Sequence, residues 1–363
     1  MAEPLVPTGQ VDLRPLTTLG VGGRARWYVR ASSVEEVATA YAWAQDRNLE
    51  VFVLGGGSNL VVADEGWPGL VLHVGINGAT FWGDGTDTFV TAGAGGTWDD
   101  LVLAVVSRGL AGVECLSGIP GTVGATPLQN VGAYGQEVAG VIDSVTAFDR
   151  ATGETLRIPS DECGFGYRMS RFKGRDAGRF VVCHVTLRVR PGFPTVTYPD
   201  LVDYVERHAI MSPGVGDVRD AVIAIRRRKG MVLDAADPDT RSVGSFFVNP
   251  VIKDEVYHRI AAGGGIPSFA AGAGFVKISA AWLIERAGFG RGFGAGGAAL
   301  STKHPLAITN RGGASAREVV ALAARIKHQV ADRFGIWLRP EPLFVGFGDD
   351  ADVAYLQAHD AAG

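Results

Sequence analysis

The sequence predicts an α+β protein of two or three lobes, and three observations lead to this fold class. The chain has 363 residues, more than the roughly 250–300 at which a single hydrophobic core stops growing. Hydrophobic residues make up 47% and charged residues 20%, a balance typical of soluble globular proteins. Strand-like stretches and capped helices follow one another without an internal repeat, and their proportions change along the chain.

Runs of β-branched and aromatic residues predict the strands, which are 27–30, 51–54, 70–74, 89–92, 141–148, 180–189 and 338–345. Capping-box spacing predicts the helices: Ser33 with Glu36 opens one that runs to about Asp46, Thr97 with Asp100 precedes 101–109, and Ser315 with Glu318 opens one that continues through Val330. The Gly/Ala-rich stretch 263–274 predicts a surface loop. The acidic, alanine-rich tail after Gly348 is expected to fray.

The order of these elements predicts three segments and a tail. A small α/β lobe covers 1–72, and a C-terminal strand at 336–347 returns to it. A mostly β lobe covers 73–215, a helix-rich domain covers 216–335, and the tail is 348–363.

Composition excludes several classes of function. The net charge is −4 without a basic block, so nucleic acid is not an expected partner. Residues 1–10 lack a secretory pattern, and the apolar runs are too short to span a membrane. Three sparse cysteines fit a reducing compartment and show no metal-ligand spacing. We expect a monomeric, metal-free, cytoplasmic protein with no membrane or nucleic-acid partner.

The 51 glycines are about twice the average usage, and some follow a strand directly. Gly55, Gly56 and Gly57 come after 51–54, where consecutive unhindered N–H groups could hold a phosphate; a plain glycine-rich hairpin is the alternative. Residues 20–25 and 290–295 also fit the pattern G-x-G-x-x-G/A. Neither match follows a clear strand and opens a long helix, so we do not expect a Rossmann site.

A second glycine-rich region spans 117–125 and continues through 129–135. Pro120 stiffens its turn, and Gln129 and Asn130 add amide groups that could read a polar ligand. Two separated loops of this kind indicate one extended dinucleotide that contacts both lobes.

These two loops resemble the FAD-binding lobes of the vanillyl-alcohol-oxidase type, and most closely the UDP-N-acetylenolpyruvoylglucosamine reductase family. The similarity continues in that family's order through 17–23, 165–168, 244–250, 282–285 and 340–342, and it covers about Leu16 to Gly346. It implies a two-lobed FAD-binding domain followed by a C-terminal α+β substrate domain. The implied chemistry is reduction of UDP-N-acetylglucosamine enolpyruvate by NADPH through noncovalent FAD.

The resemblance also implies a set of cofactor-binding residues in the two loops. They are Gly55, Gly56, Gly57, Ser58, Asn59, Leu60, Ser117, Gly118, Ile119, Pro120, Gly121, Thr122, Gly124, Ala125, Asn130, Gly132, Ala133, Tyr134 and Gly135.

Three catalytic residues are implied in the same way. Arg168 would grip the substrate carboxylate and stabilise the enolate-like intermediate; without the family match it reads as a surface arginine. Ser245 is implied as the proton donor, and Glu341 as a third group that orients or protonates the intermediate. The sequence leaves open which of these two delivers the proton.

The substrate-binding residues implied by the resemblance are Tyr167, Lys173, Tyr198, Lys229, Gly244, Asn249 and His304. Tyr198 matches the loop tyrosine of the type I subtype, which closes over the diphosphate, and Lys229 matches a diphosphate-binding lysine. Without the family match, Tyr198 would be interpreted as an ordinary loop aromatic and Lys229 as part of a basic helix end that interacts favourably with the helix dipole. His304 stands where some members carry Gln, so its contact to uridine or phosphate is left open.

Two other functions compete with the reductase. A flavin oxidase acting on an alcohol or hydroxy acid would share the FAD scaffold, because fold does not fix chemistry. A nonenzymatic nucleotide-binding module would need only the glycine loops. Arg168, Ser245 and Glu341 together favour the enzyme, and Ser245 and Lys229 favour the reductase over the oxidase.

Overall fold

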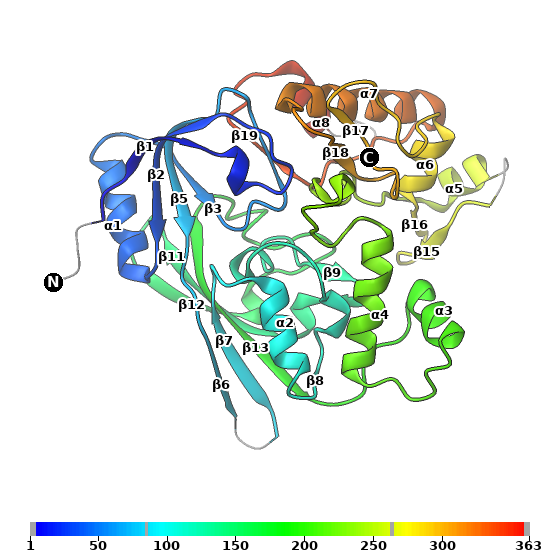
Figure 1. Cartoon of the computed structure of the whole chain (residues 1–363), viewed down its shortest axis with the longest axis horizontal. Coiled ribbons are helices and arrows are strands. Elements are labelled where there is room, and N and C mark those ends of the chain that lie inside the picture. Colours follow the sequence, from blue (N-terminus) through cyan, green and yellow to red (C-terminus); the bar gives the residue numbers. More distant parts are fainter. Residues whose placement is uncertain (1–4, 84–85, 262–264, 359–363) are drawn as a thin grey trace. The chain divides into compact units, whose positions relative to one another are not determined.

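The computed structural model describes residues 5–83, 86–261 and 265–358, which fall into two compact units (Figure 1). The described residues within 1–11, 25–57 and 68–232 form unit 1. Those within 12–24, 58–67 and 233–363 form unit 2. Residues 58–67 group with the C-terminal part because β4 (Leu60–Val62) pairs in parallel with β19 (Leu343–Val345). The three-segment division made from the sequence remains a prediction.

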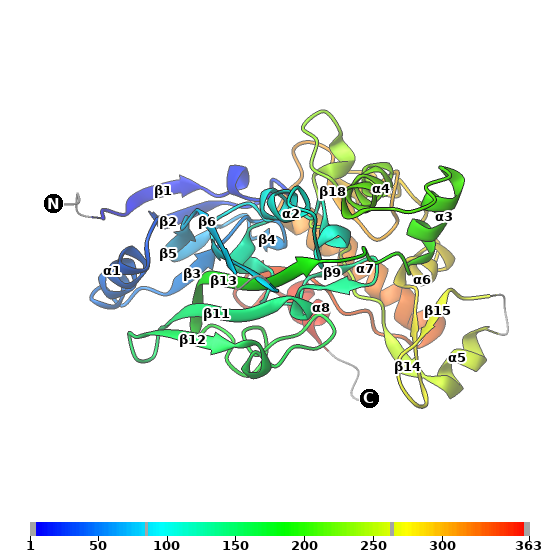
Figure 2. The same cartoon turned by 90° about the horizontal axis from the view of Figure 1, so that it is seen from below.

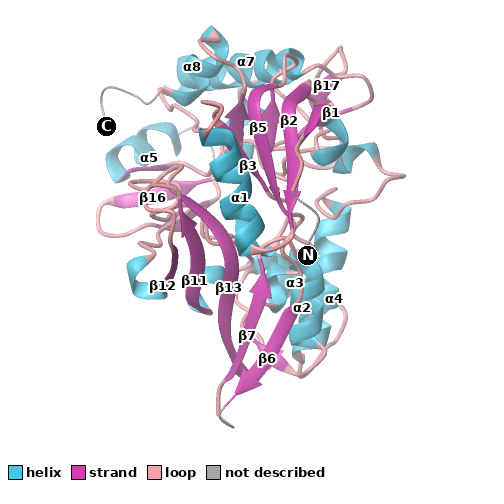
Figure 3. Ribbon diagram, turned by 90° about the vertical axis from the view of Figure 1, so that its left-hand side faces the viewer, coloured by secondary structure: helices cyan, strands magenta, loops and turns pink. Residues whose placement is uncertain are grey.

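Unit 1 contains a four-stranded sheet with one helix beside it (Figure 3). Its strands, in spatial order, are β1 (Thr8–Asp12), β2 (Arg24–Ala31), β5 (Trp67–Val74) and β3 (Val51–Leu54). The helix α1 (Val34–Gln45) begins after Ser33, whose hydroxyl accepts a 3.2 Å hydrogen bond from the Glu36 N–H, as the capping spacing predicts. Its small apolar side chains, among them Ala40 and Ala44, are buried in the core of this unit.

A second, antiparallel sheet makes up most of the remaining unit 1 core. Its strands are β12 (Thr155–Pro159), β11 (Ile142–Asp149), β13 (Phe180–Pro191), β7 (Thr88–Gly93) and β6 (Ala79–Gly83), with β8 (Leu110–Ala111) also paired to β13. Figure 2 shows β12, β11 and β13 side by side, in agreement with their registers. The helices of this part are α2 (Trp98–Val106), α3 (Pro199–Arg207) and α4 (Val215–Arg228), and a small hairpin joins β9 (Gly132–Ala133) to β10 (Gln136–Glu137).

Unit 2 combines short strand pairs with helices around its own apolar core. Besides β4 and β19, its strands are β14 (Val251–Lys253), β15 (Ser268–Ala270), β16 (Phe275–Ile278), β17 (Ala298–Leu300) and β18 (Ile308–Asn310). Its helices are α5 (Asp254–Ala261), α6 (Ala280–Arg286), α7 (Ala316–Phe334) and α8 (Ala351–Gln357). The predicted capping box is present at α7, where Ser315 and Glu318 exchange hydrogen bonds.

Three local predictions were wrong. The stretch 263–274 is not all loop, because β15 pairs with β16 in a small antiparallel sheet. The strand expected over 338–345 is limited to β19, since the chain before it contains Pro340 and Pro342, which lack the N–H that a ladder needs. The described part of the tail, 349–358, is not frayed, because Asp350 caps α8 by accepting hydrogen bonds from the backbone N–H groups of Asp352 and Val353; residues 359–363 lie outside the described residues.

A buried lysine also holds the described part of the tail. The Lys327 side chain is 0% exposed, and its Nζ donates to the carbonyls of Tyr355, Leu356 and Ala358 at 2.9, 2.8 and 2.7 Å. These carbonyls lie at the C-terminal end of α8, where a helix lacks internal partners and favours a cation. Burial lowers the pKa of Lys327 to about 8.

This lowered pKa predicts that stability will rise with pH in the alkaline range. The unfolded chain holds the Lys327 proton up to about pH 10.5, whereas the folded chain loses it above about pH 8. Between these values the unfolded state binds more protons, so the free energy of unfolding should increase with pH by up to roughly 3 kcal/mol. Chemical denaturation of the wild type and of Lys327→Met at several pH values isolates this effect. Parallel pH profiles for the two proteins would contradict it.

Within the described residues, no helix has the length and apolar character required to cross a bilayer.

Candidate functional site

The parts of the two predicted phosphate loops that belong to unit 1 contact each other. A Cβ added to Gly55 would lie 2.8 Å from Thr122 Oγ1, and one added to Gly56 would lie 2.8 Å from Gly121 Cα. Such distances leave no room for a side chain, so glycine at 56 allows the two loops to approach backbone to backbone, and glycine at 55 makes room for the Thr122 hydroxyl.

The contact between the loops carries an unused polar group. Thr122 Oγ1 is buried, and no hydrogen-bond partner for it is found among the described residues. A buried hydroxyl without a partner is unfavourable unless a ligand or water satisfies it. Together with the glycine backbone on either side, this hydroxyl fits the phosphate oxygens of a dinucleotide.

Asp99 in α2 fixes the start of the second loop. Its carboxylate accepts a 2.6 Å hydrogen bond from the Gly118 N–H and pairs in bidentate fashion with Arg219 of α4 at 2.7 and 2.8 Å. Burial opposes ionisation of Asp99, but the hydrogen bonds from Arg219 and Gly118 outweigh it and lower the pKa. The loop is therefore held by a carboxylate whose charged form is stabilised.

Asn130 holds the far part of the second loop in place. The residue is buried with a left-handed backbone (φ 45°), and its Nδ2 donates to Glu137 Oε2 and to the Gly166 carbonyl at 2.8 and 3.0 Å. Its Oδ1 accepts from the Ala139 N–H at 3.1 Å. The structure therefore uses this amide to join two segments of the chain, and its predicted contact to a cofactor remains a prediction.

Arg168 stands in a strained turn against the same loop. Its φ of 53° is rare for a residue with a side chain and is typical of positions held for function. Its guanidinium donates to the carbonyls of Gly132 and Asn130 at 2.5 and 3.3 Å. These bonds hold the half-buried guanidinium next to the predicted cofactor loop.

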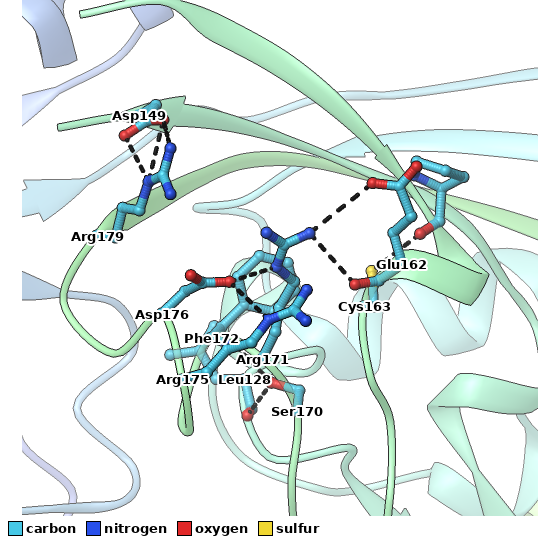
Figure 4. A network of polar contacts seen from close by, with 11 residues as sticks. Leu128, Asp149, Glu162, Cys163, Ser170, Arg171, Phe172, Arg175, Asp176 and Arg179 are labelled. Atoms are coloured by element: carbon cyan, nitrogen blue, oxygen red, sulfur yellow. Dashed lines mark hydrogen bonds and ion pairs between the residues drawn. The ribbon is translucent and has the colours of Figure 1, made fainter. Parts of the chain in front are cut away.

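The chain directly after Arg168 is braced by a polar network (Figure 4). Ser170 Oγ donates to the Leu128 carbonyl at 2.6 Å, and Arg171 Nε pairs with Asp176 at 2.6 Å. The Arg171 N–H also donates to the Cys163 carbonyl at 2.8 Å. These bonds close the segment on itself, so the turn that carries Arg168 has little freedom.

Two predicted substrate residues and one predicted cofactor residue form a single cluster in unit 1. The rings of Tyr134 and Tyr198 meet edge to face with centroids 5.3 Å apart. Lys229 Nζ lies 5.9 Å from the Tyr134 centroid and pairs with Asp200 at 2.5 Å. Burial raises the pKa of Tyr134 to about 12, so this phenol stays protonated and can donate a hydrogen bond.

Unit 2 brings Ser245 and Glu341 to one place although they are far apart in sequence. The Glu341 N–H donates to the carbonyl of Phe246, the residue after Ser245, at 2.9 Å. Asn59 Nδ2 donates to the Glu341 carbonyl at 3.2 Å. Thr18 Oγ1 donates to the carbonyls of Ser242 and Ser58 at 2.8 and 3.4 Å. The predicted cofactor residues 58–59 and the predicted acid–base pair therefore share one unit.

The remaining predicted substrate residues are distributed over the two units. In unit 1, Tyr167 lies under the Arg168 guanidinium, and Lys173 Nζ donates to Gln129 Oε1 at 3.3 Å. In unit 2, Gly244 precedes Ser245, Asn249 Oδ1 accepts from the Ala280 N–H at 2.9 Å, and the His304 N–H donates to Ser301 Oγ at 3.2 Å. Asn249 thus stabilises the start of α6, which supplies a structural reason for this residue.

Arg226 was missed by the sequence analysis as a member of this site. It lies one turn before Lys229, next to the Tyr134 hydroxyl and close to Gly118. Its Nε is buried, and no partner for it occurs in the described part of the chain. The i, i+3 spacing to Lys229 is the signal that could have singled it out among Arg226, Arg227 and Arg228.

Two family models match parts of this chain. The model of the C-terminal domain of UDP-N-acetylenolpyruvoylglucosamine reductase matches residues 237–345, and an FAD-binding domain model matches residues 25–159. Together with the mixed strands and helices, these matches confirm the predicted α+β fold, in which an FAD-binding domain is followed by a C-terminal domain.

Individual relatives extend the match to nearly the whole chain. The chain is 46% identical over 349 residues to UDP-N-acetylenolpyruvoylglucosamine reductase of Thermobifida fusca, covering 93% of this chain and 97% of the relative. It is 46% identical to the reductase of Mycobacterium marinum, with coverage of 93% and 94%. The crystal structure of the Thermus caldophilus reductase superposes with a TM-score of 0.64 and 26% identity, covering 94% of this chain and all of the other.

Proposed function

The chain belongs to the UDP-N-acetylenolpyruvoylglucosamine reductase family, and we propose that it reduces UDP-N-acetylglucosamine enolpyruvate to UDP-N-acetylmuramate with electrons from NADPH. The observation that supports this proposal is the backbone of Glu341 in unit 2, which is hydrogen-bonded to Phe246, the residue after Ser245, and to Asn59. A nonenzymatic nucleotide-binding module would not need a glutamate held next to this serine segment.

The residues of the glycine loops fit FAD as the cofactor. Gly55 and Gly56 with the buried Thr122 hydroxyl would hold the diphosphate, and Asp99 would keep Gly118 and its loop in position. Bound FAD supplies the hydride that NADPH delivers to it. We propose that it binds without a covalent link to the protein.

In the reaction, one carbon of the enol-ether double bond receives a hydride and its neighbour receives a proton. We propose that Arg168 binds the adjacent carboxylate, where negative charge accumulates between these two steps. Its pre-set turn suits this role because a fixed cation needs no reorganisation as the charge develops. Ser245 delivers the proton, and Glu341 orients the Ser245 hydroxyl or reprotonates it.

Substrate recognition is assigned to the cluster around Tyr198. We propose that Tyr198 and Lys229 bind the diphosphate of the UDP-sugar, as in the type I subtype, and that Arg226 adds charge near the same place. The ion pair between Lys229 and Asp200 supports this role because it holds the lysine in one position before substrate arrives. Tyr167, Lys173, Gly244, Asn249 and His304 remain proposed substrate contacts.

Tyr198→Phe is expected to weaken substrate binding on the order of tenfold while kcat changes less than about threefold, because one hydrogen bond to a charged group is lost. Steady-state kinetics with varied enolpyruvyl sugar measures both constants. Tyr204→Phe, within the helix α3 that begins directly after Tyr198, serves as the matched control. An unchanged KM in Tyr198→Phe would return Tyr198 to the role of an ordinary loop aromatic.

The proposed activity is tested by the stoichiometry of the overall reaction. One UDP-N-acetylmuramate, two hydrogens heavier than the substrate, should form for each NADPH oxidised, also without oxygen. NADPH oxidation that requires oxygen and yields peroxide instead would favour the flavin oxidase. We also propose that the protein acts in the cytoplasm as a monomer without nucleic-acid or membrane partners; its net charge of −4 supports the absence of a nucleic-acid partner.

A further inference from the structure

Glu114 is a buried carboxylate that the proposed mechanism does not use. Its side chain is 0% exposed, and it lies three residues before Ser117, the first residue of the second cofactor loop. Its own carbonyl accepts a 2.7 Å hydrogen bond from Ser117 Oγ. Burying a carboxyl group in such a place is unfavourable unless hydrogen-bond partners surround it.

Hydrogen-bond donors from three other residues surround this carboxylate. Oε1 accepts from the Thr195 N–H at 2.9 Å and from Gln136 Nε2 at 2.7 Å, while Oε2 accepts from the Gly112 N–H at 2.7 Å. Gln136 follows the predicted cofactor residues 132–135. Glu114 thereby joins both ends of the second cofactor region to the segment around Thr195.

All three polar groups of Thr195 are bound by this cluster. Besides its N–H, its Oγ1 accepts from Gln136 Nε2 at 3.1 Å, and its carbonyl accepts from Cys115 Sγ at 3.3 Å. Thr195 is three residues before Tyr198, in a stretch of the chain without helix or strand. Thr195 is therefore held in place, and the short segment that leads from it to Tyr198 starts at a fixed position.

We propose that Glu114 is a positioning residue for Tyr198: it fixes Thr195 against the cofactor loop and so sets where the tyrosine stands when substrate binds. This inference rests on the proposed function of Tyr198 in binding the UDP-sugar. Order in the cofactor loop would then affect substrate binding, because Ser117 and Thr195 are both held by Glu114.

The variant Glu114→Gln tests this role with little change in shape. An amide has one acceptor oxygen instead of two, so its NH₂ group must face an N–H of Thr195 or Gly112. The Kd of the oxidised holoenzyme for the enolpyruvyl sugar, measured by perturbation of the flavin spectrum, should rise on the order of tenfold. Reduction of the flavin by NADPH should change less than about twofold.

A merely structural role is separated by a control and by a double-mutant cycle. Asp149→Asn alters another fully buried carboxylate of unit 1, paired with Arg179, and should lower the Tm without changing this Kd. In a Tyr198→Ala background, Glu114→Gln should have almost no further effect on the Kd, because both act through one side chain. Additive effects in the cycle, or an unchanged Kd in Glu114→Gln, would overturn the proposal.

A second measurement does not depend on substrate turnover. Amide hydrogen exchange at Thr195 should be slow in the wild type and faster by at least about tenfold in Glu114→Gln, including in protein freed of FAD. Equal exchange rates would contradict the anchoring of Thr195. If the wild type fails to bind the enolpyruvyl sugar at all, the proposed function fails before any variant is made.

Discussion

Ser245→Ala is expected to leave reduction of the bound flavin by NADPH unchanged and to slow its reoxidation by the enolpyruvyl sugar by about three orders of magnitude. The reason is that the proton reaches the intermediate only from a positioned donor, whereas transfer of electrons from NADPH needs no such group. Anaerobic stopped-flow absorbance follows the two half-reactions separately. Normal reoxidation by the enolpyruvyl sugar would remove Ser245 from the proton-donor role.

A serine elsewhere in unit 2 provides the control for this experiment. Ser279 accepts a hydrogen bond from the Trp282 N–H and caps α6, so Ser279→Ala should reduce stability by about 1 kcal/mol. It should leave both half-reactions unchanged. A similar loss of reoxidation in both variants would mean that the Ser245 effect arises from general destabilisation of the unit.

Gly56→Ala is expected to weaken FAD binding by about tenfold to a hundredfold. The new Cβ would lie 2.8 Å from Gly121 Cα and 3.1 Å from the Thr122 nitrogen, both backbone atoms that cannot rotate away. The two loops must therefore separate, and the phosphate contacts made by both of them are lost together. Quenching of FAD fluorescence during titration into the apoprotein measures the affinity directly.

Gly216→Ala is the matched control for Gly56→Ala. Gly216 lies in α4, and no atom outside its helix is found within 4 Å of an added Cβ among the described residues. Alanine there should raise helix stability by roughly 0.5–1 kcal/mol and leave FAD affinity unchanged. Equal FAD affinity in Gly56→Ala and the wild type would contradict close approach of the loops as the basis of the cofactor site.

Elements with a local cause were predictable from the sequence. The helices after Ser33 and Ser315 begin where the capping spacing places them, because a cap involves residues only three positions apart. The α8 helix was missed although Asp350 caps its start locally; the contact that holds its other end comes from Lys327, 28 to 31 residues away. Lys327 lies in α7, so its contact with the end of α8 leaves no periodic signal in the sequence of the tail.

The site shows the same division between local and distant causes. The glycine-rich loops stand out in the sequence by their composition, but the close approach of Gly56 to Gly121 depends on the fold of unit 1. The contact of Phe246 with Glu341 and that of Glu114 with Thr195 join residues 95 and 81 positions apart. Their partners are chosen by the fold of each unit, so a single sequence gives the residue types but not the pairs.

The visible spectrum of the purified protein under anaerobic conditions tests the central claim most directly. The proposed reductase should show a flavin band that NADPH bleaches and that returns when UDP-N-acetylglucosamine enolpyruvate is added, with one equivalent of substrate consumed per flavin. A band that stays bleached after the enolpyruvyl sugar is added would contradict the proposed substrate. A protein that neither contains FAD nor binds it when supplied would contradict the account from the glycine loops onward.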